Sequence, residues 1–180
     1  MTEWPEVRLS NIASRVAQKN DVGIKRVLTV SAANGLVDQE TYFTKKIASR
    51  DLTNYWVVEP GDLVYNKSTS KDAPFGVVAR HYADEPALVT SLYIVLRADV
   101  AKVVPEYLKL ACNGAAFFGS LAGTLREGAR SHGLLNVRLQ EFFGAKSLFR
   151  RCPSSGASWT SCPPWTPKLR RWMMKLHALV

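Results

Sequence analysis

The sequence predicts a mixed α+β domain, because strand-like segments dominate its first half and helix-like segments follow. Between residues 27 and 98, short runs rich in Val, Ile and Tyr alternate with turn signals, which is typical of a sheet. After residue 99, apolar residues recur at helical spacing instead. A hydrophobic content of 47% in 180 residues is enough for one domain with a core of its own.

The first predicted element is a short amphipathic helix over residues 9–17, LSNIASRVA. Leu9, Ile12 and Val16 fall on one face of such a helix, and Ser10 is a suitable N-cap.

Strands account for most of the next 80 residues. Asn34-Gly35 and Pro60-Gly61 are turn signals that separate pairs of apolar, β-branched runs. Residues 41–49 are interpreted as a strand that passes into a helical turn. The remaining strand candidates are residues 27–31, the two halves of 55–66, residues 75–82 and residues 88–98.

Helices are expected in the following part of the chain. Pro105 suits a helix start, and Tyr107, Leu108 and Ala111 then recur at helical spacing. A second helix is predicted over residues 116–125. The segment LLNVRLQEFFGA (134–145) is expected to be a strand that enters a last short helix.

The composition changes near residue 145, where we place the boundary between a domain (1–145) and an atypical tail (146–180). From residue 142 onward the chain has seven basic residues and no acidic residue, so most of the net charge of +9 lies there. The tail is also rich in Trp, Pro and Cys, which suggests a frameshifted or degenerate end. The high overall charge is therefore weak evidence that the folded part binds a polyanion.

No catalytic or metal-binding motif is recognisable. His81, His132 and His177 have no second ligand or carboxylate at a motif spacing, and each is expected to be a surface or loop residue. Nucleotide-binding glycine loops and nucleophile motifs are also missing. The sequence therefore predicts a non-enzyme that needs no cofactor.

The chain is expected to be cytoplasmic. Three cysteines form neither a disulfide framework nor a zinc spacing, so reduced thiols are the simpler interpretation. The first residues include Glu3 and Glu6, unlike a signal peptide, and no run approaches the about 20 apolar residues of a membrane span.

The best candidate for a binding site is the polar break in GDLVYNKSTSKDAPFGVV (61–78). We expect a solvated loop between two strands, whose lysines and hydroxyls suit phosphate oxygens and whose Asn66 and Ser68 could read base edges. A hairpin loop that binds nothing is an equally good interpretation from the residues alone. The loop residues are Asn66, Lys67, Ser68, Thr69, Ser70 and Lys71.

Two further segments are candidates. Arg126, Arg130 and His132 cluster where Gly128 and Gly133 interrupt a helix, which could hold a phosphate or could be an ordinary helix end. The segment 43–55 is the third candidate, although a charged surface is the more ordinary account. Its basic and polar residues are Lys45, Lys46, Arg50, Thr53 and Asn54.

Together these stretches resemble the target recognition domain of type I restriction–modification specificity subunits. The resemblance covers about residues 4–145 and is carried by four blocks in a characteristic order: WPEVRLSNIASRV, VLTVSAANGLVDQETYFTKK, LTNYWVVEPGDLVYN and EGARSHGLLNVRLQEFF. It implies a protein that reads one half of a split site in double-stranded DNA. Methylation and cleavage would belong to partner DNA methyltransferase subunits and to a restriction and motor subunit.

The chain departs from that family in one respect. The long spacer helix that would follow the recognition domain is not recognisable after residue 145. The alternatives are a half-subunit that forms a homodimer, and a remnant or orphan domain that binds protein partners or itself rather than DNA.

Overall fold

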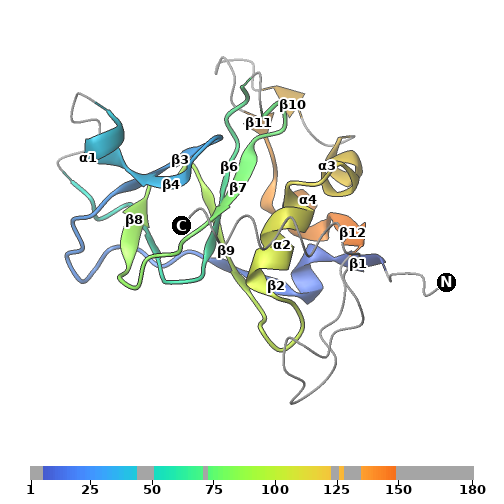
Figure 1. Cartoon of the computed structure of the whole chain (residues 1–180), viewed down its shortest axis with the longest axis horizontal. Helices are drawn as coiled ribbons and strands as arrows, with labels where there is room; N and C mark the ends of the chain where they lie inside the picture. The colour runs from blue at the N-terminus through green and yellow to red at the C-terminus, as the bar shows by residue number, and fades with distance from the viewer. Residues whose placement is uncertain (1–5, 44–50, 71–72, 123–125, 128–134, 149–180) are drawn as a thin grey trace.

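Apolar side chains that alternate along three central strands build a sheet that is buried on both faces. The structure is a computed structural model, and it describes residues 6–43, 51–70, 73–122, 126–127 and 135–148. The central sheet is antiparallel and four-stranded (Figure 1). Its strands, in spatial order, are β2 (Ala13–Val16), β9 (Ile94–Ala98), β6 (Leu63–Asn66) and β7 (Val77–Arg80).

The two faces of this sheet belong to two different cores. Leu63 and Tyr65 of β6 point into a helical-side core, which also contains Phe117 and Phe142. Val64, between them in sequence, points into a strand-side core on the other face. A one-residue shift of β6 would exchange the two sets, so the alternation fixes the register of the strand.

The strand-side core is covered by two antiparallel strand pairs. In Figure 1 these pairs lie on the side of the central sheet opposite the helices α2, α3 and α4. The pairs are β3 (Leu28–Ser31) with β4 (Gly35–Asp38), and β5 (Trp56–Val58) with β8 (Ala87–Val89); helix α1 (Gln39–Tyr42) follows β4.

The helical-side core is covered by α2 (Pro105–Cys112), α3 (Ala115–Leu121) and α4 (Leu139–Gly144). Cys112 is fully buried there, and burial raises the pKa of its thiol. Within the part of the chain that the structure describes, no helix has the length and apolar character to cross a bilayer.

Two small strand pairs complete the described structure. Strand β1 (Glu6–Arg8) pairs with β12 (Lys146–Leu148), so regular structure continues three residues past the boundary that we placed at 145. Strand β10 (Arg126–Glu127) pairs with β11 (Leu135–Asn136). Residues 149–180 of the predicted tail, with two of the three cysteines and His177, lie outside the described residues.

The predicted helix over residues 9–17 is wrong. The segment forms a 3₁₀ turn, η1 (Leu9–Asn11), followed by strand β2, in which Ala13 pairs with Ala98 and Val16 pairs with Val95. The apolar positions of the segment are compatible with a helix, and equally with a turn that is followed by a strand. The open edge of β9 decides between them, because it supplies hydrogen-bonding partners that a short isolated helix lacks.

Two other expectations need correction. Residues 88–98 form two strands rather than one, since the N–H of Tyr93 turns back to the carbonyl of Thr90 (3.1 Å) between β8 and β9. His81 is in a loop but is 2% exposed, and its Nε2 lies 2.8 Å from the carbonyl oxygen of Glu85. The main-chain N–H of His81 donates to the main-chain carbonyl of Asp62, which continues the hydrogen bonding between β6 and β7. This pairing places the imidazole ring in the interior of the domain.

Candidate nucleic-acid interface

The loop between β6 and β7 leaves the sheet through a closely packed neck. The hydroxyl of Tyr65 donates to the carbonyl of Phe75 at 2.8 Å, which ties the end of one strand to the start of the next. Burial raises the pKa of this phenol. Gly76 has φ +77°, and a Cβ atom on it would lie 2.2 Å from the carbonyl oxygen of Asn66. The neck therefore requires glycine at position 76.

Asn66 is not the solvated side chain that the sequence predicts. It is 9% exposed, and its Oδ1 accepts the N–H of Ser68 at 2.9 Å. The residue is the last of β6 and is paired with Val77, so it remains within the sheet. Its side chain forms an Asx turn that bends the chain into the loop.

The exposed part of the loop carries hydroxyl groups beside a lysine. Ser68 and Ser70 are exposed, while Lys67 and Thr69 are half-buried. The N–H of Ser70 donates to the carbonyl of Ala73 (3.1 Å), and the N–H of Ala73 donates back to Ser70. Lys67 forms no ion pair with any residue in the described ranges. Lys71 lies outside those ranges.

A second predicted segment meets this loop. The main-chain N–H of Leu135, in β11, donates to the carbonyl of Lys67 at 3.0 Å. Figure 1 accordingly places β10 and β11 beside the β6–β7 connection, at one end of the central sheet. Arg126 belongs to β10, but its side chain is not described, and Arg130 and His132 lie outside the described residues.

The third predicted segment lies elsewhere in the fold. Asn54 is exposed, and its Oδ1 accepts a hydrogen bond from the Lys19 ammonium at 3.0 Å. Thr53 donates its hydroxyl and its N–H to Asp51, and these bonds lower the pKa of that carboxyl group. In Figure 1 this region, next to β5 and β8, is separated from the β6–β7 loop. Lys45, Lys46 and Arg50 are outside the described residues.

Sequence reasoning missed the residues that shape the loop. Gly76 was available as a signal, because a glycine at the start of a strand often marks close backbone approach. The hydroxyl of Tyr65 and the N–H of Leu135 act across the fold, and local patterns carry no information about such pairings.

The described part of the loop carries hydrogen-bond donors. Among the described residues, no group of three His, Cys, Asp or Glu residues could hold a metal ion. Among the loop residues that the structure describes, Ser68 and Ser70 are exposed and Lys67 is half-buried. Such donors fit the phosphate oxygens of a nucleic acid.

Comparison with known proteins identifies the fold. A chain of a type I R-M system, described with its complex assembly and conformational transition, is similar with a TM-score of 0.57 and 15% identity over 99% of this chain. The HsdS subunit from Thermoanaerobacter tengcongensis is similar with a TM-score of 0.53 and 16% identity over 98% of this chain. This chain has the fold of an HsdS subunit.

The HsdS fold confirms the mixed-sheet recognition-domain architecture that the four sequence blocks predicted. This chain spans 42% of the length of each of the two solved chains. No family model matches the sequence, and no curated protein matches it. Because one fold can host different functions, the role of this chain is argued from its site.

Proposed function

We propose that this chain is a DNA-recognition component of a type I restriction–modification system and that it contacts duplex DNA through the β6–β7 loop. One observation carries this proposal: the hydrogen bond from Leu135 to Lys67. It joins two segments that were singled out independently for their phosphate-binding side chains. The HsdS fold supports the same reading.

The neck of the loop supports binding as well as stability. Tyr65, Gly76 and the Asx turn of Asn66 fix the point at which the loop leaves the sheet. A loop that is already ordered loses less conformational entropy when it binds. Lys67 and the hydroxyls beside it would contact phosphates, which position the protein but carry no sequence information.

The remaining predicted residues stay proposed DNA contacts. Asn66 and Asn54 are left out of the proposed contacts, since the Oδ1 of each already accepts a hydrogen bond within the chain. The proposed DNA contacts are Lys67, Ser68, Thr69, Ser70, Lys71, Arg126, Arg130 and His132, with Lys45 and Arg50 as a separate, secondary group.

In this proposal the chain performs no chemistry. Methyl transfer and cleavage belong to partner methyltransferase and restriction subunits in the cytoplasm, and this chain directs them to a half-site. The lysine and hydroxyls of the loop are suited to hold phosphates and not to transfer groups, which agrees with that division of labour.

Fluorescence anisotropy with labelled duplexes of randomised sequence tests the proposal. Affinity should fall linearly on a log–log plot as salt rises from about 50 to 200 mM, because binding releases counterions. Lys67→Ala should weaken binding to all sequences and reduce the salt slope by about one. Lys25→Ala is the matched control, since Lys25 is an exposed lysine in the segment before β3. Absence of duplex binding at the lowest salt would refute the proposal.

A further inference from the structure

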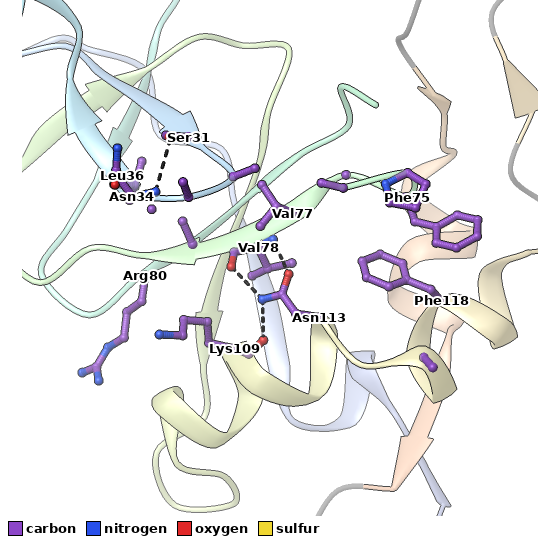
Figure 2. Close-up of a pocket in the computed structure, with 18 of the residues that line it drawn as sticks. Ser31, Asn34, Leu36, Phe75, Val77, Val78, Arg80, Lys109, Asn113 and Phe118 are labelled. Atoms are coloured by element: carbon purple, nitrogen blue, oxygen red, sulfur yellow. Dashed lines mark hydrogen bonds between the residues drawn. The ribbon is translucent and has the colours of Figure 1, made fainter. Parts of the chain in front are cut away.

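A groove of about 730 Å³ follows the outer edge of β7, between the β3–β4 hairpin and the helices α2 and α3. Figure 2 shows Asn34 and Leu36 of the hairpin on one side and Asn113 and Phe118 of the helical side on the other. β7 is the last strand of the central sheet, so this groove runs along a sheet edge. Its volume is in the range of sites that hold a ligand or a short peptide.

The groove does not bind a partner by simple addition of a strand. The side chain of Asn113 occupies the outward main-chain groups of Val78, accepting from its N–H at 2.9 Å and donating to its carbonyl at 2.8 Å. A bound partner therefore has to be held through its side chains and terminal groups, and not through main-chain pairing with Val78. The contacts available along the groove decide which occupant fits.

One end of the groove is aromatic and apolar. The ring of Phe75 stacks on that of Phe118, with centroids 5.5 Å apart and planes inclined by 27°. Phe75 is nevertheless 41% exposed, so part of its ring remains available to an occupant of the groove. Small residues, among them Ala33 and Gly119, line the space around it and leave room for another side chain.

The other end is cationic. Arg80 and Lys109 are its charged lining residues, and the described lining contains no Asp or Glu. Lys109 is bonded to Tyr82, which also lines the groove, and to Glu106, which does not. Arg80 contacts Glu106 through Nη1 at 3.5 Å and lies over the Tyr82 ring at 5.3 Å, and its Nε is buried without a hydrogen-bond partner. Its Nη2 forms no hydrogen bond with any described residue. The guanidinium thus keeps unused donors for an anionic group.

We propose that this groove binds an extended peptide that places an apolar side chain against Phe75 and a carboxylate against Arg80. Phe75 and Arg80 are five residues apart, which is at most about 17 Å, because Phe75 lies in the turn before β7. An extended peptide of about five residues covers that length. The cationic end and the lack of lining carboxylates provide charge complementarity for one acidic group.

A nucleic-acid strand fits the same groove poorly. Over about 17 Å it would carry about five phosphate charges, at 3.4 Å per charge for one strand. The groove offers two cations at one end, and Glu106 partly neutralises them. The rest of the described lining has no further cationic side chain for the remaining phosphates. This inference goes beyond the DNA-binding proposal and does not depend on it.

Panning of a phage library of random heptapeptides against the immobilised full chain tests the inference. We expect enrichment of sequences with an aromatic or aliphatic residue about four positions from an Asp or Glu. A labelled synthetic copy of the most enriched peptide should lose roughly tenfold or more in affinity when its acid is changed to the amide. It should lose a similar factor with the Arg80→Gln chain.

Two further variants make the result decisive. Phe75→Ala should also weaken the peptide, and its exposed position makes misfolding a small risk. Arg80→Glu should reject the acidic peptide and accept a version with lysine in place of the acid. Lys25→Gln, the control, should change the affinity for neither the acidic peptide nor its lysine version. The inference would be overturned if the enriched peptides lacked an acid, or if the Arg80→Gln and Phe75→Ala chains bound the peptide as tightly as the original chain does. Displacement of the peptide by an equimolar single-stranded oligonucleotide would also overturn it.

Peptide binding at the groove and DNA binding at the β6–β7 loop can be tested independently. Arg80→Gln should leave the salt-dependent affinity for duplexes unchanged, while Lys67→Ala should leave peptide binding unchanged. A single variant that abolished both would contradict the existence of two separate sites.

Discussion

The side chain of Asn113 holds both main-chain groups of Val78, so one amide group completes the hydrogen bonding of this residue at the edge of the central sheet. Its Nδ2 also donates to the carbonyl of Lys109 at 2.8 Å. Asn113 is thus both the end of helix α2 and the link between that helix and β7. Protection of this kind prevents an edge strand from pairing with another chain.

We expect Asn113→Ala to destabilise the domain by about 1–3 kcal/mol, because partly buried main-chain groups of Val78 lose their partners. Urea denaturation followed by circular dichroism measures this change. The exposed edge should also increase self-association, detectable by light scattering. Asn34→Ala, on the exposed β3–β4 turn, is the matched control and should change neither. Equal midpoints for the two variants would show that the Asn113 side chain is dispensable.

Asp62 is the most buried member of an ion pair among the described residues, and its partner Arg97 is half exposed. Asp62 is 1% exposed and accepts from Arg97 at 2.7 and 2.8 Å and from the N–H of Glu59 at 3.0 Å. Asp62→Ala should cost about 3 kcal/mol, since it leaves these donors unpaired and opens the β5–β6 turn. Lys102→Gln, which breaks an exposed pair with Asp99, should leave the denaturation midpoint unchanged. Similar midpoints for both would argue against a structural role for Asp62.

Glycine at position 76 is required by both space and backbone geometry. Gly76→Ala should lower the melting temperature more than Gly23→Ala, because both have φ +77° but only position 76 brings a Cβ against a backbone oxygen. Gly119→Ala, in helix α3 with open space around it, should stabilise the domain by about 0.5–1 kcal/mol. If the Gly76→Ala and Gly23→Ala chains have the same melting temperature, a Cβ atom at position 76 does not clash with the carbonyl oxygen of Asn66.

The stability of the domain should depend on the ionisation of Glu106. Burial alone would raise the pKa of this carboxyl group, but the hydrogen bonds from Lys109 and Tyr82 and the charges of Lys109 and Arg80 outweigh it, so the pKa is lowered. A lowered folded-state pKa adds stability above the ordinary value near 4.5, and this stability is lost as the pH falls through the folded-state pKa.

Glu106→Gln should therefore be less stable than the original chain at neutral pH, and the difference should shrink in acid. Urea denaturation at a series of pH values from about 7 to 3 measures it. Glu85→Gln, which changes an exposed acid in the loop after His81, should show no such convergence. A difference that stays constant with pH would mean that Glu106 acts through its shape and not its charge.

Local patterns predicted most of the regular structure. β5 and β6 were visible as β-branched runs around Pro60-Gly61, and α2 was visible from Pro105 and the spacing of Leu108 and Ala111. The segment that became η1 and β2 was mispredicted, since its final form depends on the edge of β9, which lies about 80 residues further along the chain.

The candidate site was predicted less completely. The polarity of residues 67–70 was enough to identify an exposed loop, but the burial of Asn66 follows from its pairing with Val77. The contact between Leu135 and Lys67 depends on how distant segments pack. The groove beside β7 was not foreseen either, because the hairpin, strand and helices that line it are separate in sequence.

Hydrogen exchange with and without duplex DNA tests the central claim most directly, because it locates the contact surface without any substitution. If the account is correct, saturating duplex at low salt will slow exchange in peptides covering residues 67–70 and 135–136 together, while residues 52–58 remain unchanged. Protection confined to the β5–β8 side, or no protection in either loop segment despite bound DNA, would contradict it.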